Sequence, residues 1–255
     1  MKFIHLSDLH IHTRQNDNQD AFSLLRFVSK AYPDHRLIIT GDIADDGTIE
    51  QFENAYELFK PFVGKVFICP GNHDFGAAGN FYSYERAVHF DDILAKPLSQ
   101  GGTFKGDSTP VVNILKDDNR EMMLIALDSN LETEQPFDFA CGEIGESQLN
   151  ALNTILSTVQ NAGMVKVLFV HHHPFVRNNP FMELIDAKAL AKTIYNRVDL
   201  VLFGHKHEMG EWKNRYGAKY VLASDNSPGK DYAAKEITID QEGVSVNAIP
   251  IRGGV

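Results

Sequence analysis

Residues 36–47 have the sequence RLIITGDIADDG, and this stretch decides the fold class. The run from Arg36 to Thr40 has the length and the apolar composition of a buried β-strand. Gly41 and Asp42 follow directly, and glycine allows the sharp turn that leaves the Asp42 carboxylate projecting beyond the strand. A buried strand that ends in a polar turn is typical of an α/β fold, in which ligands bind at the carboxyl ends of the strands.

The same pattern recurs along the chain, because short apolar runs alternate with segments of helical periodicity. Thr48 and Gln51 form a capping box at the start of one helix, and Pro33 and Pro61 end two helices. The expected strands are residues 2–6, 36–40, 65–69, 111–115, 122–127, 165–170 and 200–203, with further strands from residue 220 onward. The expected helices are residues 20–31, the segment between Thr48 and Pro61, and residues 81–94, 146–160 and 186–197. A hairpin turn is expected at residues 117–119.

Composition indicates a globular protein with a single domain that spans residues 1–255. The chain is 43% hydrophobic and 23% charged, which is ordinary for a protein with a substantial core. No linker rich in Pro, Gly or Ser separates the apolar segments, and no repeat is evident.

The charge of the chain and its targeting features indicate which binding partners and which cellular compartment to expect. With 24 basic and 34 acidic residues, the net charge is -10, so the surface repels nucleic acid and anionic membranes. A small anionic substrate remains compatible, because bound cations dominate the field inside a site. No export signal or membrane-spanning run is present, and Cys69 and Cys141 are too few for a disulfide framework. We therefore expect a cytoplasmic protein with no membrane partner.

Polar blocks that can bind metal follow the expected strands. The chain has 11 histidines, many of them clustered, and clustered imidazoles indicate metal ligation or proton transfer. The blocks are Asp8-Leu9-His10, Gly41-Asp42, Gly71-Asn72-His73-Asp74, His171-His172-His173 and Gly204-His205-Lys206-His207. Each block alone also fits a surface turn, and the histidine triplet also fits packed core histidines. All five at strand ends favour a single site at one edge of a sheet.

The ordered set of blocks resembles the calcineurin-like metallophosphoesterases, whose pattern is D-x-H, G-D, G-N-H-D, H-H and G-H-x-H. The resemblance extends from residue 8 to residue 207 and implies an α/β metallophosphoesterase-type sandwich of two mixed β-sheets flanked by helices. It also implies a phosphoester hydrolase with two divalent metal ions. One ion is expected on Asp8, His10 and His207, the other on Asn72, His171 and His205, with Asp42 bridging both.

The resemblance also implies a mechanism. Ligands that mix carboxylate, amide and imidazole without thiolate favour Mn, Fe, Zn, Co or Ni over an all-oxygen Mg or Ca site. Two such ions generate hydroxide from a shared water for in-line attack on phosphorus. We expect His73 to be the general acid, with His10 as the alternative. One role for Asp45 is to orient the attacking water or His73. The alternative is that Asp45 is only a carboxylate that precedes the helix cap Thr48.

The segment Gly41 to Gly47 is similar to that of class III cyclic nucleotide phosphodiesterases. Protein Ser/Thr phosphatases have G-D-x-V-D-R-G, with an arginine where this chain has Asp46. An arginine grips a dianionic monoester, whereas the carboxylates of Asp45 and Asp46 repel a second negative charge. The pattern predicts a phosphodiesterase that acts on a cyclic nucleotide or another small phosphodiester.

Other functions remain open from the sequence. The same chemistry can act on a nucleic-acid end, or on a nucleotide-linked lipid precursor under an apolar flap near residues 175–184. A catalytically silent interaction scaffold is the alternative of a different class. Phe75, Phe175 and Phe181 follow motif blocks and either stack on a nucleobase or pack in the core.

Overall fold

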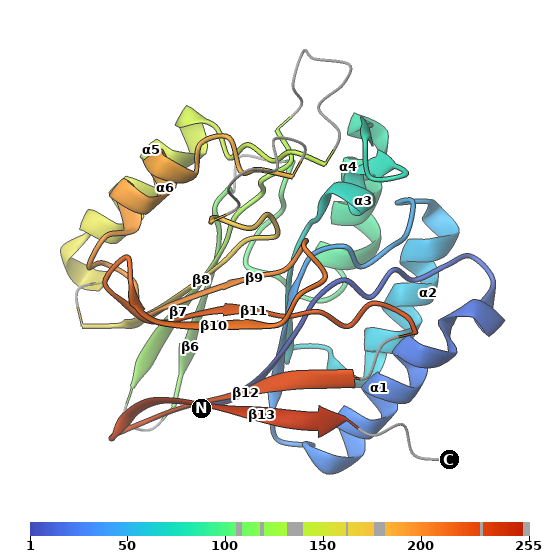
Figure 1. Cartoon of the computed structure of the whole chain (residues 1–255), viewed down its shortest axis with the longest axis horizontal. Coiled ribbons are helices and arrows are strands. Elements are labelled where there is room, and N and C mark those ends of the chain that lie inside the picture. The colour runs from blue at the N-terminus through green and yellow to red at the C-terminus, as the bar shows by residue number, and fades with distance from the viewer. Residues whose placement is uncertain are drawn as a thin grey trace.

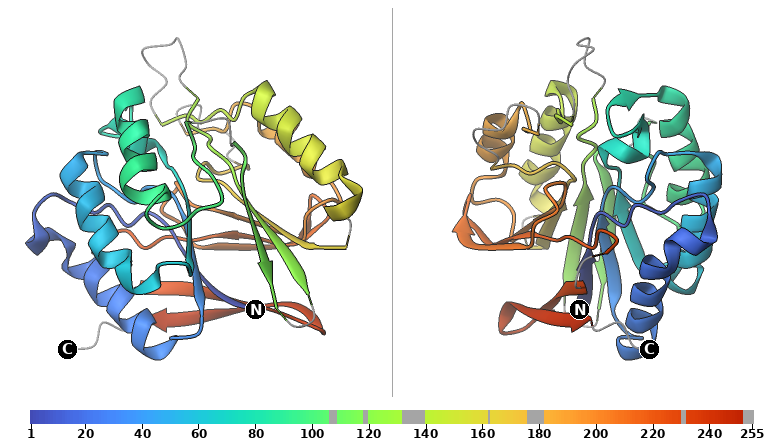
Figure 2. Two further views of the ribbon diagram at one scale, coloured as in Figure 1. Left: turned by 180° about the vertical axis from the view of Figure 1, so that it is seen from behind. Right: turned by 45° about the vertical axis from the view of Figure 1, so that its right-hand side comes forward.

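Two β-sheets pack face to face, and helices cover the outer face of each sheet, as Figures 1 and 2 show. The computed structural model describes residues 1–105, 109–117, 120–131, 140–161, 163–175, 182–229 and 232–251. Each large sheet contains both parallel and antiparallel neighbours. The prediction of two mixed sheets flanked by helices is therefore confirmed.

The first sheet has the strand order β13-β12-β1-β2-β3. Its strands are β1 (Lys2–Leu6), β2 (Arg36–Thr40), β3 (Val66–Cys69), β12 (Tyr232–Asp240) and β13 (Gly243–Ile251). The three N-terminal strands are parallel, and β12 pairs antiparallel with β1. The loops that follow β1, β2 and β3 therefore leave the sheet at the same edge.

The second sheet has the strand order β10-β11-β9-β8-β7-β6. Its strands are β6 (Val111–Lys116), β7 (Glu121–Ala126), β8 (Val165–Phe169), β9 (Leu200–Phe203), β10 (Gly210–Arg215) and β11 (Ala218–Ala223). The four inner strands are parallel, and the two edge strands are antiparallel to their neighbours. The carboxyl ends of β8 and β9 consequently share one edge.

Amphipathic helices close the sandwich on both sides (Figure 1). α1 (Gln19–Ala31), α2 (Ile49–Phe59) and α4 (Tyr84–Phe90) cover the first sheet, while α5 (Glu146–Ser157) and α6 (Ala187–Ile194) cover the second. The predicted capping box at the start of α2 is present, with the Thr48 side chain accepting from the Gln51 backbone N–H. Across the described ranges, no helix is both long and apolar enough to cross a membrane.

One predicted helix has the wrong start, and one strand was missed. The helix predicted for residues 81–94 begins only at Tyr84, because β5 (Phe81–Tyr82) pairs with β4 (Gly76–Ala77) as a short hairpin. The edge strand β10 was not predicted, since its sequence GEWKNR is polar and largely exposed. Asp118 and Asn119, in the predicted hairpin turn, lie outside the described residues.

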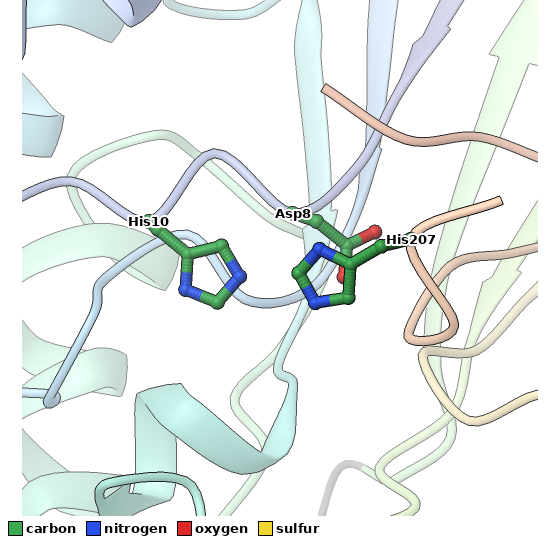
Figure 3. A group of neighbouring side chains, drawn as sticks. All are labelled: Asp8, His10 and His207. Atoms are coloured by element: carbon green, nitrogen blue, oxygen red, sulfur yellow. The ribbon is translucent and has the colours of Figure 1, made fainter. Parts of the chain in front are cut away.

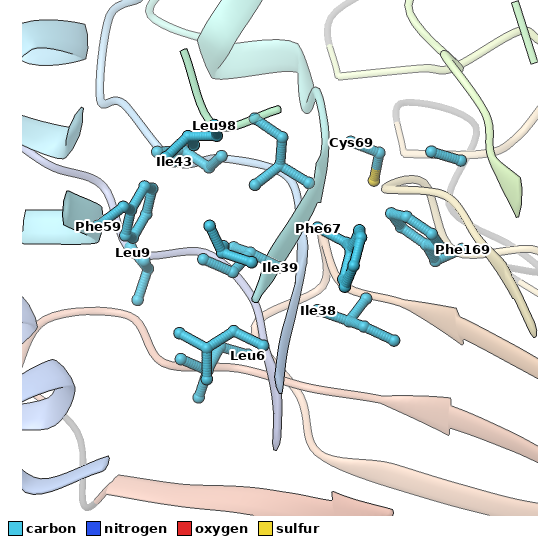
Figure 4. Close-up of a cluster of buried hydrophobic side chains, with 14 of the residues drawn as sticks. Leu6, Leu9, Ile38, Ile39, Ile43, Phe59, Phe67, Cys69, Leu98 and Phe169 are labelled. Atoms are coloured by element: carbon cyan, nitrogen blue, oxygen red, sulfur yellow. The ribbon is translucent and has the colours of Figure 1, made fainter. Parts of the chain in front are cut away.

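Apolar side chains from both sheets fill the interior, as Figure 4 shows. Phe67 and Ile38 of the first sheet belong to one buried cluster with Phe169 of the second. Leu9 and Phe59 extend the same cluster beneath the helices. This shared core fixes the two sheets against each other, and with them the loops at their carboxyl ends.

The polar side chain of His5 on β1 is fully buried. Its Nε2 lies 3.0 Å from Thr40 Oγ1. Burial, with a smaller contribution from the charge of Lys235, lowers the pKa of His5 to about 3. The folded chain therefore holds a neutral imidazole here, whereas the unfolded chain protonates it below its ordinary pKa.

We expect acid to destabilise the wild-type chain more than a His5→Gln variant. Between the ordinary pKa and about 3, the unfolded state binds one more proton than the folded state, so stability falls as pH falls. From pH 7 to pH 5 the free energy of unfolding should drop by about 2 kcal/mol more in the wild type. Urea unfolding at both pH values, with a chelator present, measures this difference. Parallel pH dependence of the two proteins would contradict it.

Candidate metal centre

The predicted ligands lie in loops at the carboxyl ends of strands from both sheets. Asp8 and His10 follow β1, Asp42 follows β2, Asn72 follows β3, His171 follows β8, and His205 and His207 follow β9. The structure brings these side chains together: three overlapping groups of potential ligands occur there, each with its donor atoms within 4.8 Å of one another. The strand order of the two sheets gathers residues as far apart in the sequence as Asp8 and His207.

Five of these residues have left-handed backbone conformations. Positive φ angles occur at Asp8 (59°), His10 (44°), Asp42 (49°), His205 (77°) and His207 (51°). Such a conformation costs a non-glycine residue about 1–2 kcal/mol, and it concentrates at functional sites. Backbone hydrogen bonds hold the first two loops together, because Asp8 N donates to Gly41 O at 3.1 Å and His10 N donates to Asp42 O at 3.0 Å.

Gly204 lets the loop after β9 touch the loop after β1. A β-carbon at this position would lie 1.8 Å from Ser7 Oγ and 2.6 Å from Asp8 Oδ2. The backbone N–H of His205 donates to Asp8 Oδ1 at 3.1 Å. Only glycine fits at this position, because the two loops approach each other so closely. Their contact joins the two sheets at the site.

The first group of donors consists of Asp8, His10 and His207, which point toward one another in Figure 3. The His10 and His207 rings stack with centroids 5.2 Å apart. His10 Nδ1 lies 3.4 Å from Asp45 Oδ1, while His10 Nε2 is buried with no hydrogen-bond partner among the described residues. A ring anchored through one nitrogen, with the other bare and buried, is the arrangement of a metal-binding histidine.

The second group is built around His171. Its Nδ1 lies 2.7 Å from the Thr40 carbonyl oxygen and must donate to it, because a carbonyl oxygen is only an acceptor. Its Nε2 has three neighbours, Asn72 Oδ1 at 3.1 Å, His205 Nδ1 at 3.2 Å and Asp42 Oδ2 at 3.2 Å. Four donor atoms therefore converge on one point.

The electrostatics of this point favour a cation. Burial lowers the pKa of His171, but the carboxylates of Asp42 and Asp8 outweigh burial and raise it to about 9. Burial opposes ionisation of Asp42, yet the imidazoles of His171, His73 and His10 hold its pKa well below the ordinary value. Burial raises the pKa of Asp8. Negative charge concentrated in an enclosed site is balanced most directly by bound cations.

The residues fit divalent metal ions. Within the described part of the chain, the Nε2 atom of His10 is buried without a hydrogen-bond partner, and an unsatisfied buried nitrogen is costly. Two carboxylates, one amide oxygen and four imidazoles form a donor set without thiolate, which suits transition-metal ions. The cluster is therefore consistent with the divalent metals that the motif resemblance implies.

His73 and Asp45 stand beside these ligands. His73 Nδ1 lies 2.7 Å from the carbonyl oxygen of Asp45, so this nitrogen carries the hydrogen and Nε2 is left for other contacts. The Asp45 carboxylate instead lies between two other rings, 3.4 Å from His10 Nδ1 and 3.3 Å from His12 Nδ1. Its hydrogen bond with His10, partly opposed by burial, lowers the pKa of Asp45, so the carboxylate is ionised.

Asp46 and Asp74 hold the loops rather than face a substrate. Asp46 Oδ1 accepts from Ala78 N at 2.6 Å, so the carboxylate expected to repel a second negative charge is turned toward the β4-β5 hairpin. Asp74 accepts backbone N–H groups from Ala44 and Gly71, both at 2.8 Å. It thereby ties the G-D loop to the G-N-H-D loop, and burial raises its pKa to about 7.

Sequence reasoning missed some residues that support the ligands. His12 continues the alternation of Asp8 and His10, which was the available signal, and it contacts Asp45. Ser227 Oγ forms a short hydrogen bond with His207 Nδ1, and Asp225 Oδ1 lies 3.8 Å from the same nitrogen. Both follow β11, whose carboxyl end shares the edge with β9, so their place after a strand was the signal.

Among the aromatic residues that follow the motifs, the two within the described ranges pack against other rings. Phe75 is 1% exposed and meets Phe90 edge to face, so it cannot stack on a nucleobase. Phe175 packs against Phe203 and Trp212. Phe181 lies outside the described residues, as does most of the predicted flap at residues 175–184.

Known structures share the fold of this chain, and known sequences are similar to it. A dimetal phosphatase from Danio rerio superposes with a TM-score of 0.67 over 99% of both chains, at 14% identity, which shows a common fold. A probable cyclic nucleotide phosphodiesterase of Coxiella burnetii is 24% identical over 94% of this chain and 87% of its own length. A 3',5'-cyclic adenosine monophosphate phosphodiesterase of Haemophilus influenzae is 25% identical over 74% of this chain and 59% of its own.

The family model described as calcineurin-like phosphoesterase matches residues 1–209. This match extends over all the motif blocks and most of the chain. The predicted family and reaction class are confirmed, and the chain is a metal-dependent phosphoester hydrolase. It belongs to the calcineurin-like phosphoesterase family.

Proposed function

We propose that the chain is a single-domain, dinuclear phosphodiesterase that hydrolyses a cyclic nucleotide or another small phosphodiester. The observation that carries this proposal is the position of Asp42 between two groups of donors. Asp42 Oδ2 lies 3.2 Å from His171 Nε2 on one side and 3.9 Å from His10 Nε2 on the other. A carboxylate with two oxygens can bridge two cations in this position.

Each side of Asp42 has its own set of ligands. Asp8, His10 and His207 would hold one ion, and Asn72, His171 and His205 the other. Two divalent ions, when bound, supply Lewis-acid stabilisation of phosphate oxygens and a water of lowered pKa. The donor types favour Mn, Fe, Zn, Co or Ni.

His73 is the residue we assign to protonate the leaving oxygen. The Asp45 carbonyl fixes Nδ1, and the His73 backbone N–H donates to Asp42 Oδ1 at 3.0 Å, so both ring and backbone are tied to the site. The His73 and His10 rings meet edge to face with centroids 4.7 Å apart. His73 Nε2 is therefore available for proton transfer at the edge of the ligand cluster.

The substrate class rests on charge and on the named relatives. The ionised carboxylate of Asp45 borders the site through His10 and disfavours the second negative charge of a monoester. Relatives that match over most of this chain are named probable cyclic nucleotide phosphodiesterases. The net charge of -10 favours a small phosphodiester over nucleic acid. We propose a cytoplasmic location with no membrane partner.

We expect the purified chain, loaded with Mn²⁺, to prefer diesters over monoesters. An aryl phosphodiester should be hydrolysed with a kcat/KM at least about tenfold above that of the matching monoester, because Asp45 repels the second charge. Asp45→Asn should narrow this preference. Parallel assays with cyclic AMP, a nucleotide diphosphate conjugate and a single-stranded oligonucleotide identify the natural class. A preference for the monoester would contradict the proposal.

The role of His73 predicts a dependence on the leaving group. In His73→Gln, kcat should fall by about 10²–10⁴ on a cyclic nucleotide, whose alkoxide needs a proton. On a 4-nitrophenyl diester the loss should be far smaller, because nitrophenolate leaves without one. The metal content of the variant serves as the control and should equal that of the wild type. Equal losses on both substrates would rule out the general-acid role.

The role of Asp42 predicts a stoichiometry. We expect elemental analysis to find two Mn²⁺ ions per wild-type chain, and at most one in Asp42→Asn, because the bridge loses its charge. Asp34→Asn is the matched control, since Asp34 is an exposed carboxylate outside the site. Full occupancy in Asp42→Asn would show that this residue is no bridge.

A further inference from the structure

A short hairpin follows the G-N-H-D block in the sequence and lies next to the site. Its strands β4 and β5 pair Ala77 with Phe81, and the tip is a tight turn in which Asn80 N donates to Ala77 O at 3.1 Å. The two central residues of the turn, Ala78 and Gly79, have φ angles of 51° and 69°. Two successive positive φ angles are the signature of a type I′ turn, and residues 78–80 connect the paired Ala77 and Phe81.

The tip of this turn touches two residues of the site. The Gly79 carbonyl oxygen accepts from Asn72 Nδ2 at 3.0 Å. A carbonyl oxygen accepts only from the amide nitrogen, so this bond sets which way the Asn72 amide faces and directs Oδ1 toward His171 Nε2 at 3.1 Å. A β-carbon on Gly79 would lie 2.6 Å from His73 Nε2 and 2.7 Å from Asn72 Nδ2.

The hairpin is anchored at both ends. At the tip, the Asp46 carboxylate accepts from Ala78 N at 2.6 Å and holds a residue whose left-handed conformation is unfavourable. At the base, Lys105 Nζ lies 4.6 Å from the Phe75 ring centroid and 5.3 Å from that of Tyr82. Lys105 also pairs with Asp128 at 2.6 Å. The G-D loop therefore fixes the tip of the hairpin, and Lys105, which is held by the segment after β7, fixes its base.

We propose that the hairpin Gly76–Tyr82 is a positioning element of the metal centre, with Gly79 as its main positioning residue. The Gly79 carbonyl selects the orientation in which the Asn72 oxygen, rather than its NH₂ group, faces the cation. The absence of a side chain on Gly79 leaves room for the His73 ring. Asp46, which stands where phosphatases of this family have arginine, serves this element. The inference rests on the proposed metal centre and adds the device that orients one of its ligands.

The test compares Gly79→Ala with Gly64→Ala by calorimetric titration of the whole chain with Mn²⁺. Gly64 has a φ of 75° and nothing within 4 Å of an added β-carbon, so both variants share the backbone strain and only one disturbs the site. We expect the Kd for Mn²⁺ to rise at least about tenfold in Gly79→Ala, as for other groups that orient metal ligands. In Gly64→Ala it should stay within about twofold of the wild type, with a comparable fall in melting temperature.

A second pair of variants acts on the anchor. Asp46→Ala removes the acceptor for the Ala78 N–H and should weaken Mn²⁺ binding, whereas Asp46→Asn keeps an oxygen there and should restore most of it. Equal Kd values for Gly79→Ala and Gly64→Ala, or for Asp46→Ala and the wild type, would overturn the positioning role. A wild-type chain that binds no Mn²⁺ would instead overturn the metal centre, and this inference with it.

Discussion

The carboxylate of Asp42 is buried where the two sheets meet, and a buried negative charge is stable only when donors or cations surround it. The His73 backbone N–H and His171 Nε2 lie within 3.0 Å and 3.2 Å of its oxygens. These groups lie in the segments that follow β3 and β8, which belong to different sheets. Balancing this one charge therefore requires the sandwich to be assembled and its loops to be in register.

In this fold, different segments supply stability and carry unfavourable backbone conformations. Apolar strands and helices supply the burial that holds the sheets together, while the loops at their carboxyl ends adopt left-handed conformations that are locally unfavourable. The same loops exchange backbone hydrogen bonds, so each constrains the next. Side chains such as Asp74 and Asp46 then fix the loops relative to each other. The strands and helices therefore supply the stability, and the loops at their ends carry the functional side chains.

The parts of this architecture that follow from sequence are those with local signals. β9 is an unbroken apolar run and β2 has an apolar centre, and the ligands Asp42 and His205 each follow a glycine just beyond the strand, so their convergence on one edge could be predicted. β10 could not, because an exposed polar edge strand has no apolar signature. The hairpin at Gly79 had no signal of its own, and its second strand was included in the helix predicted from residue 81; only its contacts with Asn72 and Asp46 explain it. The contacts of Ser227 and His12 likewise depend on which loops become neighbours in space.

Locating the ions directly tests the claim that one carboxylate joins two metal sites. Crystals grown with Mn²⁺, measured by anomalous diffraction at the manganese edge, should show two peaks within coordination distance of the Asp42 carboxylate. One peak should contact the side chains of Asp8 and His10, and the other those of Asn72 and His171. A single peak, or two peaks of which one does not touch Asp42, would contradict the account.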